Sequence, residues 1–176
     1  MKKAILTLGL ILACVINTTL VAQDKKVGIR AGYQSSFLSD DGNKVGSSKS
    51  GFYVGAYRDT KVFPFLHFST GIEYSQLGTS SLDNGDYALN YVGIPLGIKA
   101  QVGPVFASAG SGFNIKVDES GNPYSNNAKW YDIPAYVGAG VNILFVTVEA
   151  KQVWGLTNIN NGLNNNSFQL GLSMRF

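Results

Sequence analysis

The feature that most limits the fold of this chain is the alternation of apolar with small or polar residues. It recurs from Val27 to the last residue in runs of about ten, and clusters of Gly, Asn, Asp and Ser separate the runs. Eight such runs can be counted: 27–34, 51–57, 66–75, 92–100, 105–117, 131–142, 146–154 and 167–176. Successive side chains of a strand point to opposite faces, so each run has one largely apolar face.

The same sequence pattern limits the kinds of structure with which the chain can span a membrane. After residue 22 no stretch of about 20 apolar residues follows, so a membrane-spanning helix is not expected. Only a helix or a closed barrel can cross a bilayer with every backbone group hydrogen-bonded. The sequence therefore predicts an all-β fold, an eight-stranded antiparallel up-and-down transmembrane β-barrel.

A soluble lipocalin-like barrel is the alternative, with the apolar row pointing inward around a ligand. Charged residues make up 14% of the chain, whereas a soluble domain usually carries about 25%. The polar row consists mainly of Gly, Ser, Asn and Gln, which suits a filled lumen better than a hydrated surface. The composition therefore favours the membrane barrel.

The first residues have the layout of a secretory signal peptide. Lys2 and Lys3 precede an apolar core and a small residue, Ala22. We expect residues 1–22 to be cleaved, leaving residues 23–176 as the barrel. Cys14 gives a weaker alternative, a lipoprotein cleavage site. Cleavage after Ala22 removes this single cysteine, which excludes disulfides and thiolate metal sites.

Connection lengths predict the orientation, because outer-membrane barrels have short periplasmic turns and longer external loops. A periplasmic N-terminus and C-terminus make 59–64, 103–104 and 144–145 periplasmic turns, and 39–50, 78–86, 118–129 and 157–166 external loops. Aromatic residues near both sets of strand ends are typical of interface girdles. The periplasmic group is Phe63, Phe65, Phe145 and Phe176, and the outer group is Phe37, Tyr74, Phe113, Trp130, Tyr131, Trp154 and Phe168.

Pro95 and Pro134 lie inside predicted strands, although proline cannot donate a ladder hydrogen bond. Both follow an isoleucine near the outer end of a descending strand. We expect a bulge or a local break at similar height in both strands.

Charged residues on the predicted inward row form the candidate site. They are Arg30, Glu73, Lys99, Asp132, Glu149, Lys151 and Arg175. Charges of a membrane barrel must face the interior and find partners, so we expect a salt-bridged network that fills a lumen only wide enough for its own side chains. A gated or proton-responsive pore is the functional alternative.

Two further patterns suggest chemistry but have simpler interpretations. His67, with Ser69 and Glu73 on the same face, resembles a hydrolase site, yet these positions spread over about 20 Å along a strand. The glycines of 110–112 and 138–140 lack the strand-to-helix context of a phosphate loop. We expect them to make room for large neighbours such as Tyr136 and Lys99. No catalytic residue, cofactor or metal is expected.

Several motifs resemble the PorT-like outer-membrane β-barrel family of Bacteroidetes-type bacteria. They are 91–99 (YVGIPLGIK), 103–105 (GPV), 138–141 (GAGV) and 154–159 (WGLTNI). The resemblance covers essentially the whole mature chain and implies an eight-stranded barrel of mostly undefined role. A few relatives are associated with a protein secretion system, but this chain is short for them and has no added plug or periplasmic domain, so that role is not transferred.

The charge balance excludes one class of partner. Removal of Lys2 and Lys3 leaves 12 of the 14 Lys and Arg residues against 11 Asp and Glu, a net charge of +1, so no basic field for nucleic acid is expected. We expect a non-enzymatic outer-membrane protein with a structural or surface-interaction role of its external loops. Its partners would be outer-membrane lipid, the barrel-assembly machinery during insertion, and a surface or envelope protein. A narrow channel, a secretion accessory and an envelope-lipid enzyme remain as alternatives.

Overall fold

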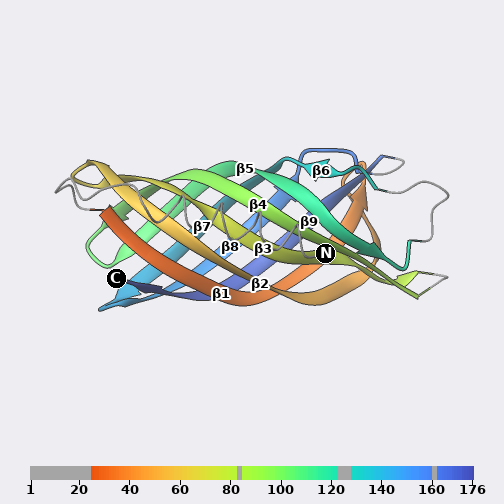
Figure 1. The fold of residues 1–176 in the computed structure, drawn as a ribbon, viewed down its shortest axis with the longest axis horizontal. Coiled ribbons are helices and arrows are strands. Elements are labelled where there is room, and N and C mark those ends of the chain that lie inside the picture. The colour runs from red at the N-terminus through yellow and green to blue at the C-terminus, as the bar shows by residue number, and fades with distance from the viewer. Residues whose placement is uncertain (1–24, 83–84, 123–127, 160–161) are drawn as a thin grey trace, which may run out of the picture.

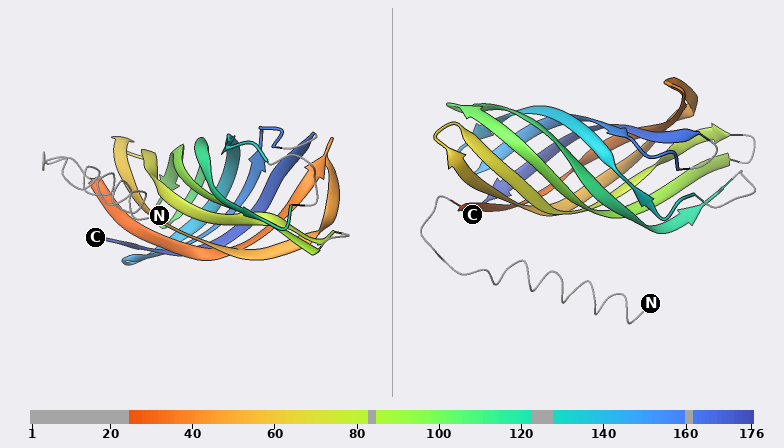
Figure 2. Two further views of the ribbon diagram at one scale, coloured as in Figure 1. Left: turned by 45° about the vertical axis from the view of Figure 1, so that its right-hand side comes forward. Right: turned by 90° about the horizontal axis from the view of Figure 1, so that it is seen from above.

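The described part of the chain forms one antiparallel sheet that closes on itself (Figures 1 and 2). The computed structural model describes residues 25–82, 85–122, 128–159 and 162–176. The strands are β1 (Lys25–Asp40), β2 (Asn43–Phe63), β3 (Leu66–Leu82), β4 (Gly85–Val102), β5 (Val105–Ser120), β6 (Tyr131–Asp132), β7 (Pro134–Ile143), β8 (Val146–Gly155) and β9 (Leu163–Arg175). Within these ranges, no helix is long and apolar enough to cross a membrane. The predicted signal peptide, 1–22, lies outside the described residues.

Ring closure confirms the predicted strand number. β1 pairs with β9, and β4 pairs with β5, so the hydrogen-bonded ring is complete. β6 and β7 both pair with β5 and form one strand of the ring, interrupted at Ile133. The ring therefore has eight strands. They run at a marked tilt to the long axis, as closure of a barrel requires (Figure 1).

The two ends of the barrel differ in their connections. At the terminal end, where β1 begins and β9 ends, the turns are Pro64–Phe65, Gly103–Pro104 and Leu144–Phe145. The last two confirm the prediction. The predicted turn 59–64 is wrong, because β2 continues to Phe63.

At the opposite end, the loop end, the strands continue into segments that were predicted as loops. The prediction for 39–50 is wrong, since β1 and β2 are joined by the two-residue turn Asp41–Gly42. Both residues have positive φ, 45° and 83°, as a type I′ hairpin turn requires. Strand also extends through Leu82 and from Gly85 within 78–86, to Ser120 within 118–129, and from Leu163 within 157–166. Residues 83–84, 123–127 and 160–161 of these predicted loops lie outside the described residues.

The outer face of the barrel is apolar, which excludes the soluble lipocalin-like alternative. In β1 and β9 the residues of the predicted apolar row are exposed, and the opposite row is buried or half-buried. The exposed apolar side chains include Val27, Ile29, Ile94, Leu96, Ile98, Leu170 and Leu172. A soluble barrel would place these side chains inside and polar ones outside, so this surface requires an apolar solvent.

Aromatic side chains border this apolar belt at both ends. Phe63, Phe65, Phe145 and Phe176 are exposed at the terminal end. Toward the loop end, Phe113 stacks on Tyr131 with ring centroids 6.0 Å apart, and Trp130 meets Tyr131 edge-on at 4.9 Å. The clustering of aromatics near the strand ends agrees with the predicted girdles.

The prolines break the ladder at one height, as predicted. The β3–β4 pairing passes from Thr70–Leu96 to Glu73–Gly93 without pairs between them, where Pro95 lies. Pro134 directly follows the interruption at Ile133. A Cβ atom at Gly112 of β5 would lie 3.4 Å from Cα of Pro95 and 3.5 Å from Cγ of Pro134, so the two breaks flank the same residue.

The apolar belt predicts the effect of a charge on the outer face. Leu172→Arg places a cation midway between the girdle residues Phe168 and Phe176, and we expect a loss of about 2–4 kcal/mol in the free energy of unfolding. Urea unfolding in lipid vesicles measures it. Val117→Arg is the matched control, since Val117 is also exposed but lies beyond the loop-end girdle; its expected cost is about 0–1 kcal/mol. Equal losses in both variants would contradict a bilayer around the belt.

Candidate functional site

An ion cluster crosses the middle of the lumen. Arg30 of β1 and Lys151 of β8 both approach Glu73 of β3, with Nε–Oε2 and Nζ–Oε2 distances of 2.9 and 3.8 Å. Gln169 donates through Nε2 to Gln34 Oε1 at 2.6 Å and to Glu73 Oε1 at 3.4 Å. All three charged side chains are nearly buried, between 6 and 13% exposed. The cluster therefore links opposite walls of the barrel.

Aromatic rings and glycines complete the filling of the lumen. Nζ of Lys151 lies 5.1 Å from the ring centroid of Tyr53 and 5.7 Å from that of Tyr136. Tyr136 occupies space that a side chain at Gly110 would need, since a Cβ there would lie 2.8 Å from Tyr136 Cζ. This confirms the predicted steric role of Gly110.

Lys99, which was predicted as one of the large neighbours of these glycines, is not among the nearest neighbours of any of them. A Cβ at Gly138 would lie 2.7 Å from Cγ of Lys151, and one at Gly140 would overlap the ring of Phe106. These glycines make room for Lys151 and Phe106 rather than for Lys99. Nζ of Lys99 instead lies 4.5 Å from the centroid of the same Phe106 ring, on the neighbouring strand β5.

The other predicted charges do not join the central cluster directly. Lys99 pairs with Asp59 at 2.6 Å, nearer the terminal end. Glu149 accepts a hydrogen bond from Ser108 Oγ at 3.0 Å, and Asp132 accepts one from Asn165 Nδ2 at 3.1 Å. Arg175 donates to the backbone oxygen of Leu144 at the terminal end. The seven residues therefore do not form a single network. Arg30, Glu73 and Lys151 form the central cluster, and the other four residues make separate contacts along the lumen or at its rim.

Sequence reasoning missed several lumen residues. Asp59 was assigned to a turn because the second predicted strand ended at Tyr57, although Asp59 continues the inward row of Tyr53 and Tyr57. Gln34 and Gln169 are fully or almost fully buried, but their uncharged side chains gave no signal beyond their place on the polar row.

His67 has no hydrolase partners in this arrangement. It lies opposite Lys61 and Lys99 in the ladder, and Glu73 is bound by Arg30 and Lys151 six residues away. Among the described residues, no group of three or more His, Cys, Asp and Glu could hold a metal ion. The geometry therefore gives no support to hydrolysis at His67.

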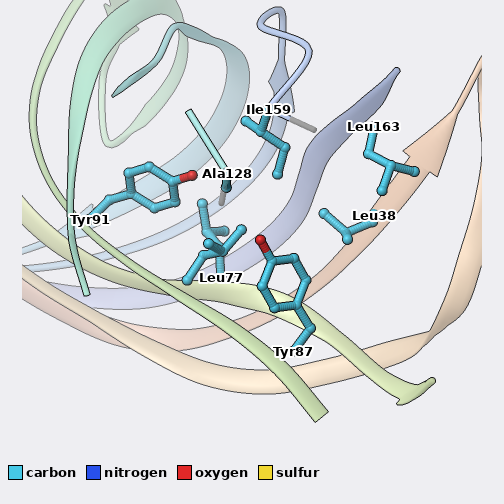
Figure 3. Close-up of a cluster of buried hydrophobic side chains, with 8 residues drawn as sticks. Leu38, Leu77, Tyr87, Tyr91, Ala128, Ile159 and Leu163 are labelled. Atoms are coloured by element: carbon cyan, nitrogen blue, oxygen red, sulfur yellow. The ribbon is translucent and has the colours of Figure 1, made fainter. Parts of the chain in front are cut away.

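An apolar cluster caps the lumen at the loop end (Figure 3). Beyond the girdle, apolar residues join polar ones such as Thr79 in the interior, and Leu38, Tyr87 and Leu89 are fully buried. The loop-end cap consists of Leu38, Leu77, Tyr87, Leu89, Tyr91, Ala128, Ile159 and Leu163. The amide of Lys129 donates to the oxygen of Ile159 at 2.8 Å and ties two connecting segments together across the mouth.

A polar contact holds Ala128 in this cap. Glu119 Oε1 accepts hydrogen bonds from Tyr87 Oη at 2.7 Å and from the Ala128 amide at 3.1 Å, and Lys116 pairs with its other oxygen. Burial would raise the pKa of this carboxyl, but the hydrogen bonds from Lys116, Ala128 and Tyr87 outweigh it and lower the pKa below its usual value. Glu119 therefore stays ionised and keeps its donors at neutral pH.

A small cavity lies between the cap and the ion cluster. It measures about 50 Å³ and is bordered by Glu73, Asp132, Lys151 and Asn165, among others. This volume suits a few water molecules, and Oδ1 atoms of Asp132 and Asn165 are buried there with no partner among the described residues. The cavity is therefore large enough for water to satisfy these oxygens.

Comparison with known proteins shows the fold. No protein-family model matches the sequence, and no curated protein matches it significantly. The structure resembles Ail of Yersinia pestis, solved with the heparin analogue sucrose octasulfate, with a TM-score of 0.56 and 15% identity over 86% of this chain and 99% of that one. It also resembles Neisserial surface protein A, with a TM-score of 0.57 and 16% identity over 85% and 97% of the two chains. The chain thus has the fold of an integral outer-membrane β-barrel.

The ion cluster predicts an unequal response to single and combined substitutions. Glu73→Gln leaves the nearly buried Arg30 and Lys151 without their shared carboxylate, and we expect the free energy of unfolding to fall by about 3–5 kcal/mol. The combined replacement Arg30→Met, Glu73→Leu and Lys151→Met removes all three charges and should be less destabilised than Glu73→Gln. Urea unfolding in vesicles compares the two. A triple variant less stable than the single one would contradict this account.

Proposed function

We propose that this protein is a closed, non-enzymatic barrel of a bacterial outer membrane, with a structural or surface-interaction role at its loop end. The observation that carries the proposal is the combination of an apolar outer belt with a lumen blocked twice, by the ion cluster around Glu73 and by the loop-end cap. An eight-stranded barrel is only wide enough to hold its own side chains. A channel would need a continuous polar path through both barriers.

The loop end is the part that we propose faces the cell exterior, with both termini in the periplasm. The turns at the terminal end are two residues long, and the strands extend beyond the girdle only at the loop end. Long external extensions and short periplasmic turns are typical of outer-membrane barrels. Insertion by the barrel-assembly machinery, a signal peptide at 1–22 and membership of the PorT-like family belong to the same proposal, which the motifs quoted above support.

The ligand of the Ail complex does not carry over to this chain. Sucrose octasulfate is a polyanion, and its recognition needs a basic surface. The described loop end instead mixes both signs, and two of its lysines are engaged in the ion pairs Lys49–Asp86, at 2.9 Å, and Lys116–Glu119. The proposed surface role is therefore contact with a protein or envelope component of mixed charge.

Cysteine labelling tests the orientation, since the chain has one cysteine, Cys14, inside the predicted signal peptide. We expect Lys44→Cys, on the exposed loop-end hairpin, to react with a membrane-impermeant maleimide in intact cells. Pro104→Cys, in an exposed turn of the terminal end, is the matched control and should react only after the outer membrane is permeabilised. The reverse pattern would overturn the orientation.

Conductance tests closure of the lumen. Purified protein in planar bilayers should give no resolved current steps, because ions would have to pass both the cluster around Glu73 and the loop-end cap. Heat-dependent gel mobility of the same proteoliposomes controls for a folded, inserted barrel. Current steps whose number follows the amount of folded protein would favour the narrow channel instead.

A further inference from the structure

The cavity between the ion cluster and the loop-end cap is bordered by oxygen atoms that lack donors. Four buried side-chain oxygens on its walls have no hydrogen-bond partner among the described residues: Glu73 Oε2, Asp132 Oδ1, Asn165 Oδ1 and Gln169 Oε1. Of these, Glu73 Oε2 is held by the ion pairs of the cluster. The described residues that line the cavity contribute no buried side-chain nitrogen without a partner. A group that fills the cavity and satisfies these atoms must therefore attract oxygen.

Asp132 directs one carboxylate oxygen toward this cavity. Its side chain lies in β6 beside the interruption at Ile133 and is 1% exposed. A Cβ atom at Gly155, which also borders the cavity, would lie 3.2 Å from Oδ1, so the glycine leaves room beside this oxygen. The other oxygen, Oδ2, accepts a hydrogen bond from Asn165 Nδ2 at 3.1 Å. The carboxylate is thus held by one oxygen and open at the other.

The negative charge of Asp132 has no cation beside it in the described part of the chain. No Lys or Arg there forms an ion pair with it. Lys151 borders the same cavity, but its Nζ approaches Glu73 at 3.8 Å and the Tyr53 ring at 5.1 Å. Ile133 and Thr157 lie near the carboxylate as neutral donors, and neither makes a hydrogen bond to Oδ1. A buried carboxylate is costly unless a cation accompanies it.

Asn165 gives an independent sign of a ligand at the same place. It is 3% exposed, and its amide nitrogen also donates to the hydroxyl of Tyr91 in the loop-end cap (Figure 3) at 3.3 Å. The two bonds of this nitrogen fix the amide, because a flipped amide would turn its oxygen toward the Asp132 carboxylate. Its Oδ1 therefore stays an acceptor without a partner. Buried polar atoms in folded proteins are almost always hydrogen-bonded or otherwise bound.

We propose that this cavity binds a hydrated alkali metal cation, for which sodium is the probe, at Oδ1 of Asp132 and Oδ1 of Asn165. Carboxylate and amide oxygens are ligands of hard cations. One unpaired carboxylate is neutralised by one positive charge, and the described residues contain no group of three or more His, Cys, Asp and Glu for a metal ion of higher charge. The volume of about 50 Å³ leaves room for water in the coordination shell. The site goes beyond the proposed function, since it requires the folded barrel but neither its orientation nor a surface partner.

Thermal unfolding in two salts tests the site in the mature chain, folded in uncharged detergent micelles at neutral pH. Sodium chloride replaces choline chloride at constant ionic strength, because choline is too large for the cavity, and circular dichroism gives the midpoint. We expect sodium at several times its dissociation constant to raise the midpoint by about 2–4 °C. Asp132→Asn should abolish this rise. In choline chloride it should also unfold at a higher temperature than the wild type, because it removes a buried charge that lacks a partner.

Asp118→Asn is the matched control. It removes an exposed carboxylate of the loop end, which accepts a hydrogen bond from Asn90 Nδ2 at 3.0 Å, and it should keep the rise of the wild type. If Asp132→Asn does not fold, Asn165→Ala takes its place and should reduce the rise.

The other occupants of the cavity give different results. Water alone predicts equal midpoints in the two salts, and a general salt effect predicts the same rise in Asp132→Asn as in the wild type; either result would overturn the proposal. A divalent cation predicts that calcium chloride raises the midpoint more than sodium chloride at equal ionic strength and that Asp132→Asn abolishes this difference. That result would replace the alkali metal cation.

Discussion

The structure depends on one constraint: backbone groups inside a bilayer must find hydrogen bonds within the protein. Closing the sheet through the β1–β9 and β4–β5 pairs satisfies it. Closure also creates a narrow interior that has to be filled, and alternation decides that the filling is polar. The ion cluster, the tyrosines that surround it and the glycines that admit them all follow from an apolar row that faces outward. The hydrogen-bond ladder is interrupted at two places beside Gly112, because Pro95 and Pro134 lie there at the same height.

The side chains that fill the lumen differ between its middle, its loop end and its terminal end. In the middle, Glu73 shares two cations and a glutamine. Toward the loop end, the same inward row turns apolar and Leu38 and Leu89 are fully buried. Toward the terminal end, Lys61, His67 and Lys99 line up in adjacent strands. At the first two levels side chains occupy the lumen, whereas at the third Lys26, Lys61 and His67 border a recess of about 190 Å³.

The sequence predicted the ring better than its ends. The strand number, the outward row, the turns 103–104 and 144–145 and the proline breaks follow from alternation and from the chemistry of glycine and proline. The segments 39–50 and 78–86 were predicted as loops because they are rich in Gly, Asn, Asp and Ser, which are typical of turns. Much of each segment nevertheless pairs as strand beyond the girdle, where apolar residues such as Leu38, Leu77 and Leu89 lie on the inward row. The pairing of Lys99 with Asp59 could not be predicted, because partner choice in the lumen depends on shear between strands. Seven inward charges were identified as a set, but the sequence could not divide them into levels.

The reversal of the pattern beyond the girdle has a consequence for how the exposed end can change. The loop-end segments are strands with an apolar core of their own, and β1 and β2 are joined there by the tight turn Asp41–Gly42. The residues that point into water there, such as Asn43 and Ser48, are therefore not part of the core. Substitutions at such positions cost the fold little. The loop end thus offers a firm surface whose chemical character can change by substitution while the barrel beneath it stays the same.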